Sequence, residues 1–258
     1  MSDVALLIPV GLLIGVLLGS VGGGGSLLAV PALIYLGNQS VRGAQAGALV
    51  VVIVAAAIGS VSYLRRGEVR WRAGLAFGAA TAVSSFAASL LARALNPDLL
   101  LLAFSPVMVL GAAAMVSERA RGESSFRPWR YGVGARSAVG VVLLGFAVGW
   151  LTGLFGVGGG FVIVPALVLS LGFAMTEAVG TSLLVSVIGS IVALLVRLHG
   201  GGVEWATILP FAAAAAFGVL FGSRLGERVS TDALTRWFAL LVVATALYTG
   251  TEALASLL

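Results

Sequence analysis

The chain has 258 residues, of which 60% are hydrophobic and 10% are charged, with a mean hydropathy of +1.12. Soluble domains carry roughly a quarter of their residues charged, so this composition excludes a water-soluble domain and indicates a membrane protein. The net charge of +5 rests on fifteen arginines without any lysine. In a membrane chain these arginines mark cytoplasmic loops rather than a nucleic-acid partner. The absence of cysteine excludes disulfides and thiolate metal sites.

Eight predominantly apolar stretches are long enough, at about 20 residues or more, to cross a bilayer as helices. In chain order they lie at 4–36, 44–64, 73–92, 99–117, 137–172, 178–196, 205–223 and 237–258. The longest polar connection is an arginine-rich linker at 118–136, so we expect a first membrane repeat at 1–117 and a second at 137–258. The first stretch of each repeat is too long for one straight crossing at a rise of about 1.5 Å per residue.

A glycine cluster interrupts both of these long stretches. Its glycines are Gly22, Gly23, Gly24 and Gly25 in the first stretch and Gly156, Gly158, Gly159 and Gly160 in the second. Pro31 follows the first cluster as Pro165 follows the second, an offset of 134 residues that also relates Trp71 to Trp205. The chain is therefore a tandem duplication, and repeats with broken membrane segments are typical of transporters.

The predicted fold is an all-α polytopic membrane protein of two tandem homologous repeats. Each repeat has a glycine-broken first segment plus three transmembrane helices. The repeats are parallel if the broken segments cross once, and inverted if these segments return as re-entrant hairpins. With the loop 65–72 and the linker in the cytoplasm, the parallel arrangement places ten arginines against five, and the inverted one twelve against three. Because arginines collect on the cytoplasmic side, we expect inverted repeats.

Each glycine cluster precedes a short helix, expected at 26–36 and 160–171. The first turn of a helix has free N–H groups and a partial positive charge. Two such ends facing each other near the middle of the membrane would bind a small anion without any fixed cation. The predicted substrate-binding residues are the clustered glycines named above, Ser26, Thr181 and Ser182, and the predicted gating kinks are Pro31 and Pro165. The spaced glycines Gly11, Gly15 and Gly19 are better explained by close helix packing.

Hydroxyl side chains follow the second cluster. Thr181 and Ser182 open the next helix, and Ser186 and Ser190 lie on the face of Ser182 because residues four apart share a face. These hydroxyls either line an anion path or bond to neighbouring helices. The first repeat has Ala46-Gly47-Ala48 at the matching positions, so the site is not symmetric.

The second break resembles a known family. The resemblance is carried by Thr152-Gly153-Leu154-Phe155-Gly156-Val157-Gly158-Gly159-Gly160, by Val164-Pro165-Ala166-Leu167, by Ala178-Val179-Gly180-Thr181-Ser182-Leu183 and by the degenerate copy from Gly19 to Leu33. These motifs are similar to the sulfite exporter TauE/SafE family, also called the toluene sulfonate uptake permease family. The resemblance covers nearly the whole chain. It implies a multi-pass transporter in the inner membrane of a bacterium or archaeon, with sulfite, sulfoacetate, sulfonates or similar small anions as substrates. The departure at Ala46-Gly47-Ala48 argues against equivalent ligand contacts from both repeats.

The combined prediction is a secondary transporter, exporter or permease, of a small sulfur-containing anion by alternating access. Its partners are the substrate and the lipid bilayer, with no cofactor or metal; proton or ion coupling and the oligomeric state, a homodimer included, stay open. An anion channel is the alternative. A metal-cation permease is disfavoured because the spans lack carboxylate, histidine or thiolate clusters. An enzyme is disfavoured because no span offers a base for Ser182. Arg197 and His199 fall in a loop after the stretch 178–196.

Overall fold

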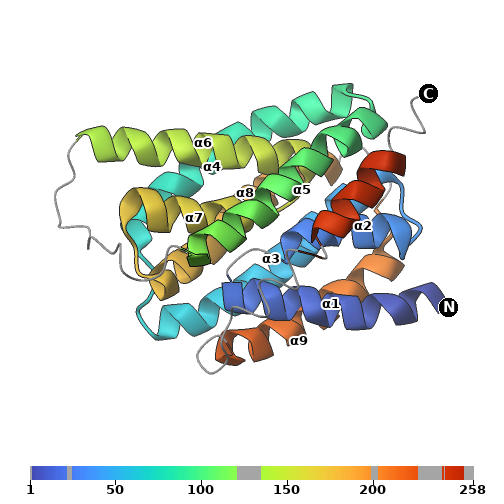
Figure 1. The fold of residues 1–258 in the computed structure, drawn as a ribbon, viewed down its shortest axis with the longest axis horizontal. Helices are drawn as coiled ribbons and strands as arrows, with labels where there is room; N and C mark the ends of the chain where they lie inside the picture. The colour runs from blue at the N-terminus through green and yellow to red at the C-terminus, as the bar shows by residue number, and fades with distance from the viewer. Residues whose placement is uncertain are drawn as a thin grey trace.

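The computed structural model describes residues 2–21, 25–120, 135–198, 203–225, 240 and 242–252, and every regular element within them is an α-helix. In chain order the helices are α1 (Ser2–Val21), α2 (Ser26–Tyr35), α3 (Val41–Arg65), α4 (Trp71–Ala94), α5 (Pro97–Ala120), α6 (Ala135–Phe155), α7 (Gly160–Leu171), α8 (Met175–Leu198) and α9 (Trp205–Leu225) (Figure 1). Residues 242–252 are also helical. The prediction of an all-α chain is confirmed. Gly22, Gly23, Gly24 and His199 lie outside the described residues.

The two short helices lie where the glycine clusters predict them. α2 and α7 differ from the expected ranges only in that α2 ends at Tyr35. α7 follows Gly159, whose φ is +67°, and ends at Gly172, whose φ is +62°, a left-handed conformation that strains any residue with a side chain. α5 continues to Ala120 and α6 begins at Ala135, so both helices extend a few residues into the stretch 118–136 that the sequence analysis takes as the linker.

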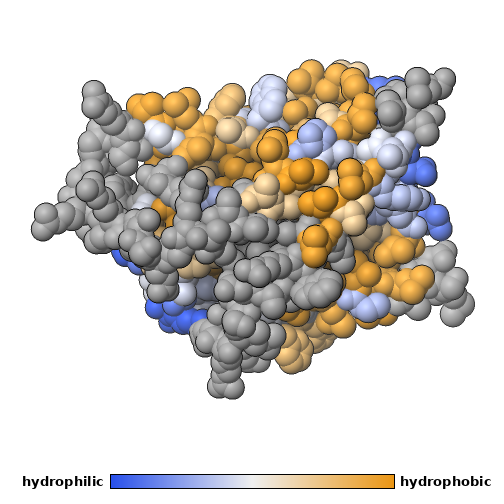
Figure 2. Space-filling view, in the orientation of Figure 1, coloured by the Kyte–Doolittle hydropathy of each residue, from blue (hydrophilic) through white to orange (hydrophobic). Residues whose placement is uncertain are grey.

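Within the described part of the chain, four helices are long and apolar enough to cross a membrane: α3, α4, α8 and α9. α1, α2, α5 and α6 contain shorter apolar segments. Figure 2 shows hydrophobic residues predominating across the middle of the molecule, with strongly hydrophilic patches toward its left and right ends. Trp71 and Trp205 begin α4 and α9 and are about half exposed, at 52% and 45%, which suits aromatic residues at a membrane interface. The chain is therefore a polytopic membrane protein.

α3 and α8 pack against each other in the middle of the molecule and run antiparallel. Gln45, near the start of α3, bonds to Arg197, near the end of α8. Tyr63, near the end of α3, lies against Gly180, near the start of α8. In Figure 1 the pair α4 and α6 lies above these two helices and the pair α1 and α9 lies below them. The central pair thus connects the two outer pairs.

The spaced glycines make the close contacts within the outer pairs, as predicted. A Cβ atom added at Gly11 would lie 2.9 Å from the carbonyl oxygen of Phe211, and one added at Gly145 would lie 2.8 Å from that of Phe77. Gly19 lies against Val219, farther along both helices, so α1 and α9 run parallel. Small residues at these positions allow two backbones to approach, which is the common way for membrane helices to associate.

Candidate functional site

The second glycine break turns the chain between α6 and α7. Gly156 and Gly159 have φ values of +71° and +67°, so both positions need glycine. A Cβ atom added at Gly156 would lie 2.7 Å from the carbonyl oxygen of Gln45, and one added at Gly158 would overlap the side chain of Val52. The break therefore lies directly against α3, a helix of the other half of the chain.

The N-terminal ends of the two short helices approach each other at α5. Leu27 and Phe161 are the second residues of α2 and α7. A Cβ atom added at Gly111 would lie 3.1 Å from Leu27 Cδ1 and 2.7 Å from Phe161 Cδ2. Gly25, immediately before α2, packs against Ile14 in the middle of α1 rather than at its end. The first turns of both helices thus lie near one position of α5 inside the protein, and α2 begins at the depth of the middle of α1.

Arg197 is the largest departure from the sequence prediction. It was expected in a loop, but it belongs to α8, and only 8% of its surface is exposed. Its Nη1 donates to Gln45 Oε1 at 2.6 Å, and its Nη2 donates to the carbonyl oxygens of Gly153 and Leu154 at 2.5 and 3.0 Å. These carbonyls belong to the last turn of α6. A guanidinium therefore lies buried at the α6 end of the second break, where the sequence analysis expected no fixed cation.

Tyr63 makes the corresponding contact in the first half of the chain. Its hydroxyl donates to the carbonyl oxygen of Gly19 at 2.9 Å. Gly19 belongs to the last turn of α1, as Gly153 belongs to the last turn of α6. The last carbonyls of a helix lack partners within the helix. Both broken segments therefore receive a hydrogen-bond donor from the helix pair α3 and α8.

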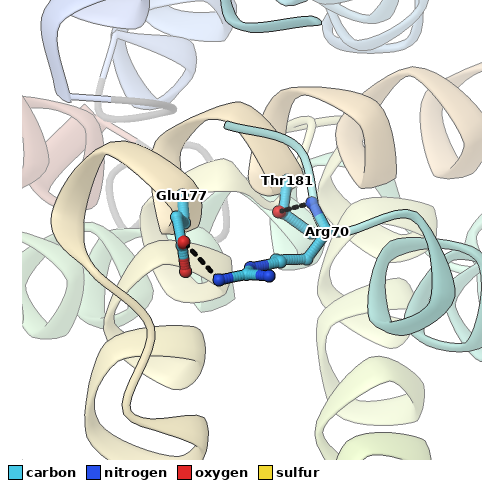
Figure 3. Close-up of polar contacts among 3 residues, drawn as sticks. All are labelled: Arg70, Glu177 and Thr181. Atoms are coloured by element: carbon cyan, nitrogen blue, oxygen red, sulfur yellow. Dashed lines mark hydrogen bonds and ion pairs between the residues drawn. The ribbon is translucent and has the colours of Figure 1, made fainter. Parts of the chain in front are cut away.

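Thr181 and Ser182 lie at the start of α8, at the opposite end from Arg197. Both are fully buried. Thr181 Oγ1 accepts a hydrogen bond of 3.1 Å from the backbone N–H of Arg70, and Ser182 Oγ donates to the carbonyl oxygen of Val179 at 2.8 Å. Figure 3 shows that Arg70 also pairs with Glu177, with 2.5 Å between Nη2 and Oε1. The structure thus separates these two hydroxyls from the α6–α7 break and joins Thr181 to the start of α4.

A second polar contact joins the halves at the other end of α8. Gln39, between α2 and α3, donates through Nε2 to Glu204 Oε2, and Glu204 also accepts from Thr207. Glu204 stands just before α9 as Arg70 stands just before α4, at the same offset of 134 residues. Each end of the central helix pair is therefore connected to the other half by a loop contact.

The hydroxyls of Ser186 and Ser190 are buried without a hydrogen-bond partner among the described residues. α3 and α8 pack in register, with Gly59 beside Leu183 and Gln45 beside Arg197. Moving back seven residues along α3 from Gly59 and forward seven along α8 from Leu183 places Ser190 at the level of Val52. The side chain of Val52 occupies the space beside Gly158. Unpaired hydroxyls in an apolar interior are costly, so these two residues remain candidates for contact with a polar ligand.

Of the other predicted site residues, Ser26 and Gly160 are the first residues of α2 and α7, where ligand-binding N–H groups were expected. Pro31 and Pro165 lie inside these helices. Sequence reasoning missed two contacts, that of Arg197 with Gln45 and that of Tyr63 with Gly19. The available signal was the 134-residue offset, which relates Tyr63 to Arg197 as it relates Gly19 to Gly153.

The chain is similar in sequence to known membrane proteins. The family model described as Sulfite exporter TauE/SafE matches residues 7–249, nearly the whole chain. The chain belongs to the TauE/SafE family. A relative from Xylella fastidiosa named "Probable membrane transporter protein" is 32% identical over 92% of this chain and 90% of its own length. The protein YunE of Bacillus subtilis, with the same descriptive name, is 25% identical over 92% and 94%. No solved structure matches the chain at a significant level. Membership of the TauE/SafE family makes the protein a membrane transporter.

Proposed function

We propose that the protein is a secondary transporter that moves a small, sulfur-containing oxyanion by alternating access. The anion is held where the N-terminal ends of α2 and α7 converge. One observation carries this proposal: Leu27 and Phe161, the second residues of the two helices, contact the same position of α5 at Gly111. Two helix N-termini aimed at one region offer free N–H groups and partial positive charge, which favour an anion over a cation.

The repeat organisation that we propose is inverted. α3 and α8 occupy equivalent positions in the two halves and run antiparallel. α1 packs on α9 as α6 packs on α4, through equivalent glycines. In Figure 1, α1 starts at the right-hand end of the molecule and α6 at the left-hand end. An arrangement of this kind relates the halves by a two-fold axis in the membrane plane, and substrates of such transporters bind near the midplane.

The re-entrant path of the broken segments supports the same arrangement. α1 ends beside Tyr63 at the far end of α3, and α2 begins beside Ile14 and leads back to the start of α3 at Val41. Backbone without helical hydrogen bonds is tolerated at this depth only where protein or a water-filled cavity surrounds it. Thr181 and Ser182 lie at the α1 end of this path and are proposed to line the first break.

The substrate class rests on the family description, "Sulfite exporter", together with the donor groups described above. A sulfite or sulfonate group presents several acceptor oxygens to converging N–H donors. The arginine distribution favours an orientation with loop 65–72 and the linker in the cytoplasm. The direction of transport and the coupling ion are then determined by flux measurements.

The test is flux through purified protein in liposomes loaded in turn with sulfite, sulfate, thiosulfate, sulfoacetate and a carboxylate. Wild type is compared with Gly158→Ala, which places a methyl group against Val52 at the break, and with the control Gly140→Ala in α6, where a Cβ atom meets nothing within 4 Å. We expect saturable flux with counterflow for a sulfur oxyanion, lost in Gly158→Ala and kept in Gly140→Ala. Flux that neither saturates nor shows counterflow would identify an anion channel. The absence of flux for every anion would refute the proposal.

A further inference from the structure

The positive charge of Arg197 is not balanced by a negative charge on any of its hydrogen-bond partners. Its three acceptors are the amide oxygen of Gln45 and the carbonyl oxygens of Gly153 and Leu154, all of them neutral groups. No carboxylate among the described residues lies within ion-pair distance of Arg197. A guanidinium has five N–H donors. Here the buried Nε has no acceptor within the described part of the chain.

The equivalent contact in the first half shows that capping a broken helix does not require a charge. Tyr63 supplies a neutral hydroxyl to the carbonyl of Gly19, where Arg197 supplies a cation to that of Gly153. Burying an ion is costly unless an opposite charge compensates it. In membrane segments, ionisable residues therefore mark substrate or ion pathways as a rule. The second break therefore has a buried charge at position 197, where the first break has the neutral Tyr63.

We infer that Arg197, positioned by Gln45, forms an anion-binding site at the α6 end of the second break. The inference rests on the proposed anion transport and deepens it, because it names the fixed cation and the break that carries it. The ligand class is a small oxyanion such as sulfite, whose oxygen accepts from the Nε–H of Arg197. Gly156 brings the turning backbone against Gln45, so the break and the cation share one neighbour.

The site lies toward one face of the membrane. Arg197 is the residue before the last of α8, and Gln45 stands in the second turn of α3. The loops at this end are those between α2 and α3 and between α8 and α9, joined by Gln39 and Glu204. An anion that crosses the protein therefore meets Arg197 outside the midpoint where α2 and α7 converge. The matching place near the other face holds Tyr63, whose hydroxyl donates to the carbonyl oxygen of Gly19.

The experiment compares wild type, Arg197→Gln, Arg197→Lys and Tyr63→Phe as purified full-length proteins. Thermal unfolding is followed while sulfite, sulfate, thiosulfate and sulfoacetate are titrated at constant ionic strength. Loss of a charge-assisted hydrogen bond lowers affinity by about tenfold or more. We expect that loss in Arg197→Gln, a smaller one in Arg197→Lys, which keeps the charge, and an unchanged affinity in Tyr63→Phe.

The outcomes separate this inference from the proposed function. Unchanged anion affinity in Arg197→Gln, with wild type binding normally, overturns the site at Arg197 and leaves anion transport standing. If none of the four anions stabilises wild type, and flux is absent as well, the proposed function fails with it. Should Arg197→Gln not unfold cooperatively, Arg197→Lys decides: a lower melting temperature with unaltered affinity assigns Arg197 a structural role only and overturns the inference.

Discussion

Tyr63 and Arg197 occupy equivalent positions 134 residues apart, and each donates a hydrogen bond to the carbonyl of the equivalent glycine that lies in the last turn of a broken helix. The acceptors are Gly19 in α1 and Gly153 in α6. The same carbonyl therefore accepts a hydrogen bond in both halves, whereas the chemistry of the donor differs. Both halves keep this hydrogen bond, but only the donor in the second half is charged. Comparing substitutions at Tyr63 and Arg197 therefore separates the contribution of the hydrogen bond from that of the charge.

Replacing Tyr63 by Phe removes one buried hydrogen bond and keeps the ring. We expect the free energy of unfolding in detergent to fall by about 1 kcal/mol, because the Gly19 carbonyl loses its side-chain donor. Tyr248→Phe is the control, since Tyr248 is 52% exposed. Equal stability of wild type and Tyr63→Phe would show that the hydroxyl does not stabilise the end of α1.

The packing glycines can be tested by two substitutions in one helix. A Cβ atom at Gly149 would overlap Ser84 and Thr81 of α4, whereas one at Gly140 meets nothing within 4 Å. We expect Gly149→Ala to destabilise the protein by about 1–3 kcal/mol through overpacking, and Gly140→Ala to leave it unchanged or about 1 kcal/mol more stable through helix propensity. Thermal melting compares them. Equal effects of the two variants would contradict close packing of α4 on α6.

Ser190 and Ser85 are both fully buried but differ in their hydrogen bonds, so they can be compared directly. The single hydroxyl proton of Ser85 has two acceptors within reach, the carbonyl oxygens of Ala82 at 3.1 Å and Gly189 at 3.3 Å, while Ser190 Oγ has no partner within the described residues. Ser85→Ala should lower stability by about 1 kcal/mol. Ser190→Ala should be neutral or stabilising, because an unpaired hydroxyl leaves the interior, and should reduce anion flux if that hydroxyl contacts the substrate. A destabilised Ser190→Ala would reveal a partner for this hydroxyl.

The Arg70–Glu177 pair is expected to matter little for stability. The two side chains are 45% and 25% exposed, and exposed pairs contribute about 0–1 kcal/mol. A double-mutant cycle with Arg70→Ala and Glu177→Ala measures the pair alone, because the Arg70 backbone N–H keeps its bond to Thr181. We expect a coupling energy below about 1 kcal/mol that weakens in high salt. A coupling energy of several kcal/mol would instead show that this ion pair holds the start of α8 firmly against the start of α4.

Much of the fold follows from the sequence because lipid leaves few alternatives. Apolar length predicts α3, α4, α8 and α9, and the glycine clusters predict the starts of α2 and α7. These features are local in the sequence. A segment that crosses lipid must form its backbone hydrogen bonds within its own helix, and a glycine cluster marks the point where that helix is interrupted.

The Arg197 contacts could not be predicted in the same way. An arginine after a long apolar run has the same sequence pattern whether it reaches solvent or turns inward. Its acceptors at Gly153 and Leu154 lie more than 40 positions earlier in the chain, and Gln45 lies in the other half. Only the packing of α3, α6 and α8 decides the orientation of this side chain. The unpaired hydroxyls of Ser186 and Ser190 are likewise a property of the assembled helices.

The exchange of partners between the outer helix pairs bears on how such a chain could have arisen. α1 packs mainly on α9 and α6 mainly on α4, so the largest contact of each first helix is with the other half. In the inverted arrangement that we propose, a polypeptide of half this length would expose that face until a second copy, inserted in the opposite orientation, covered it. The ancestor before gene fusion would then be a dimer of one chain in two orientations. Halves produced today from separate messages should reconstitute the transporter only when both are made in the same cell.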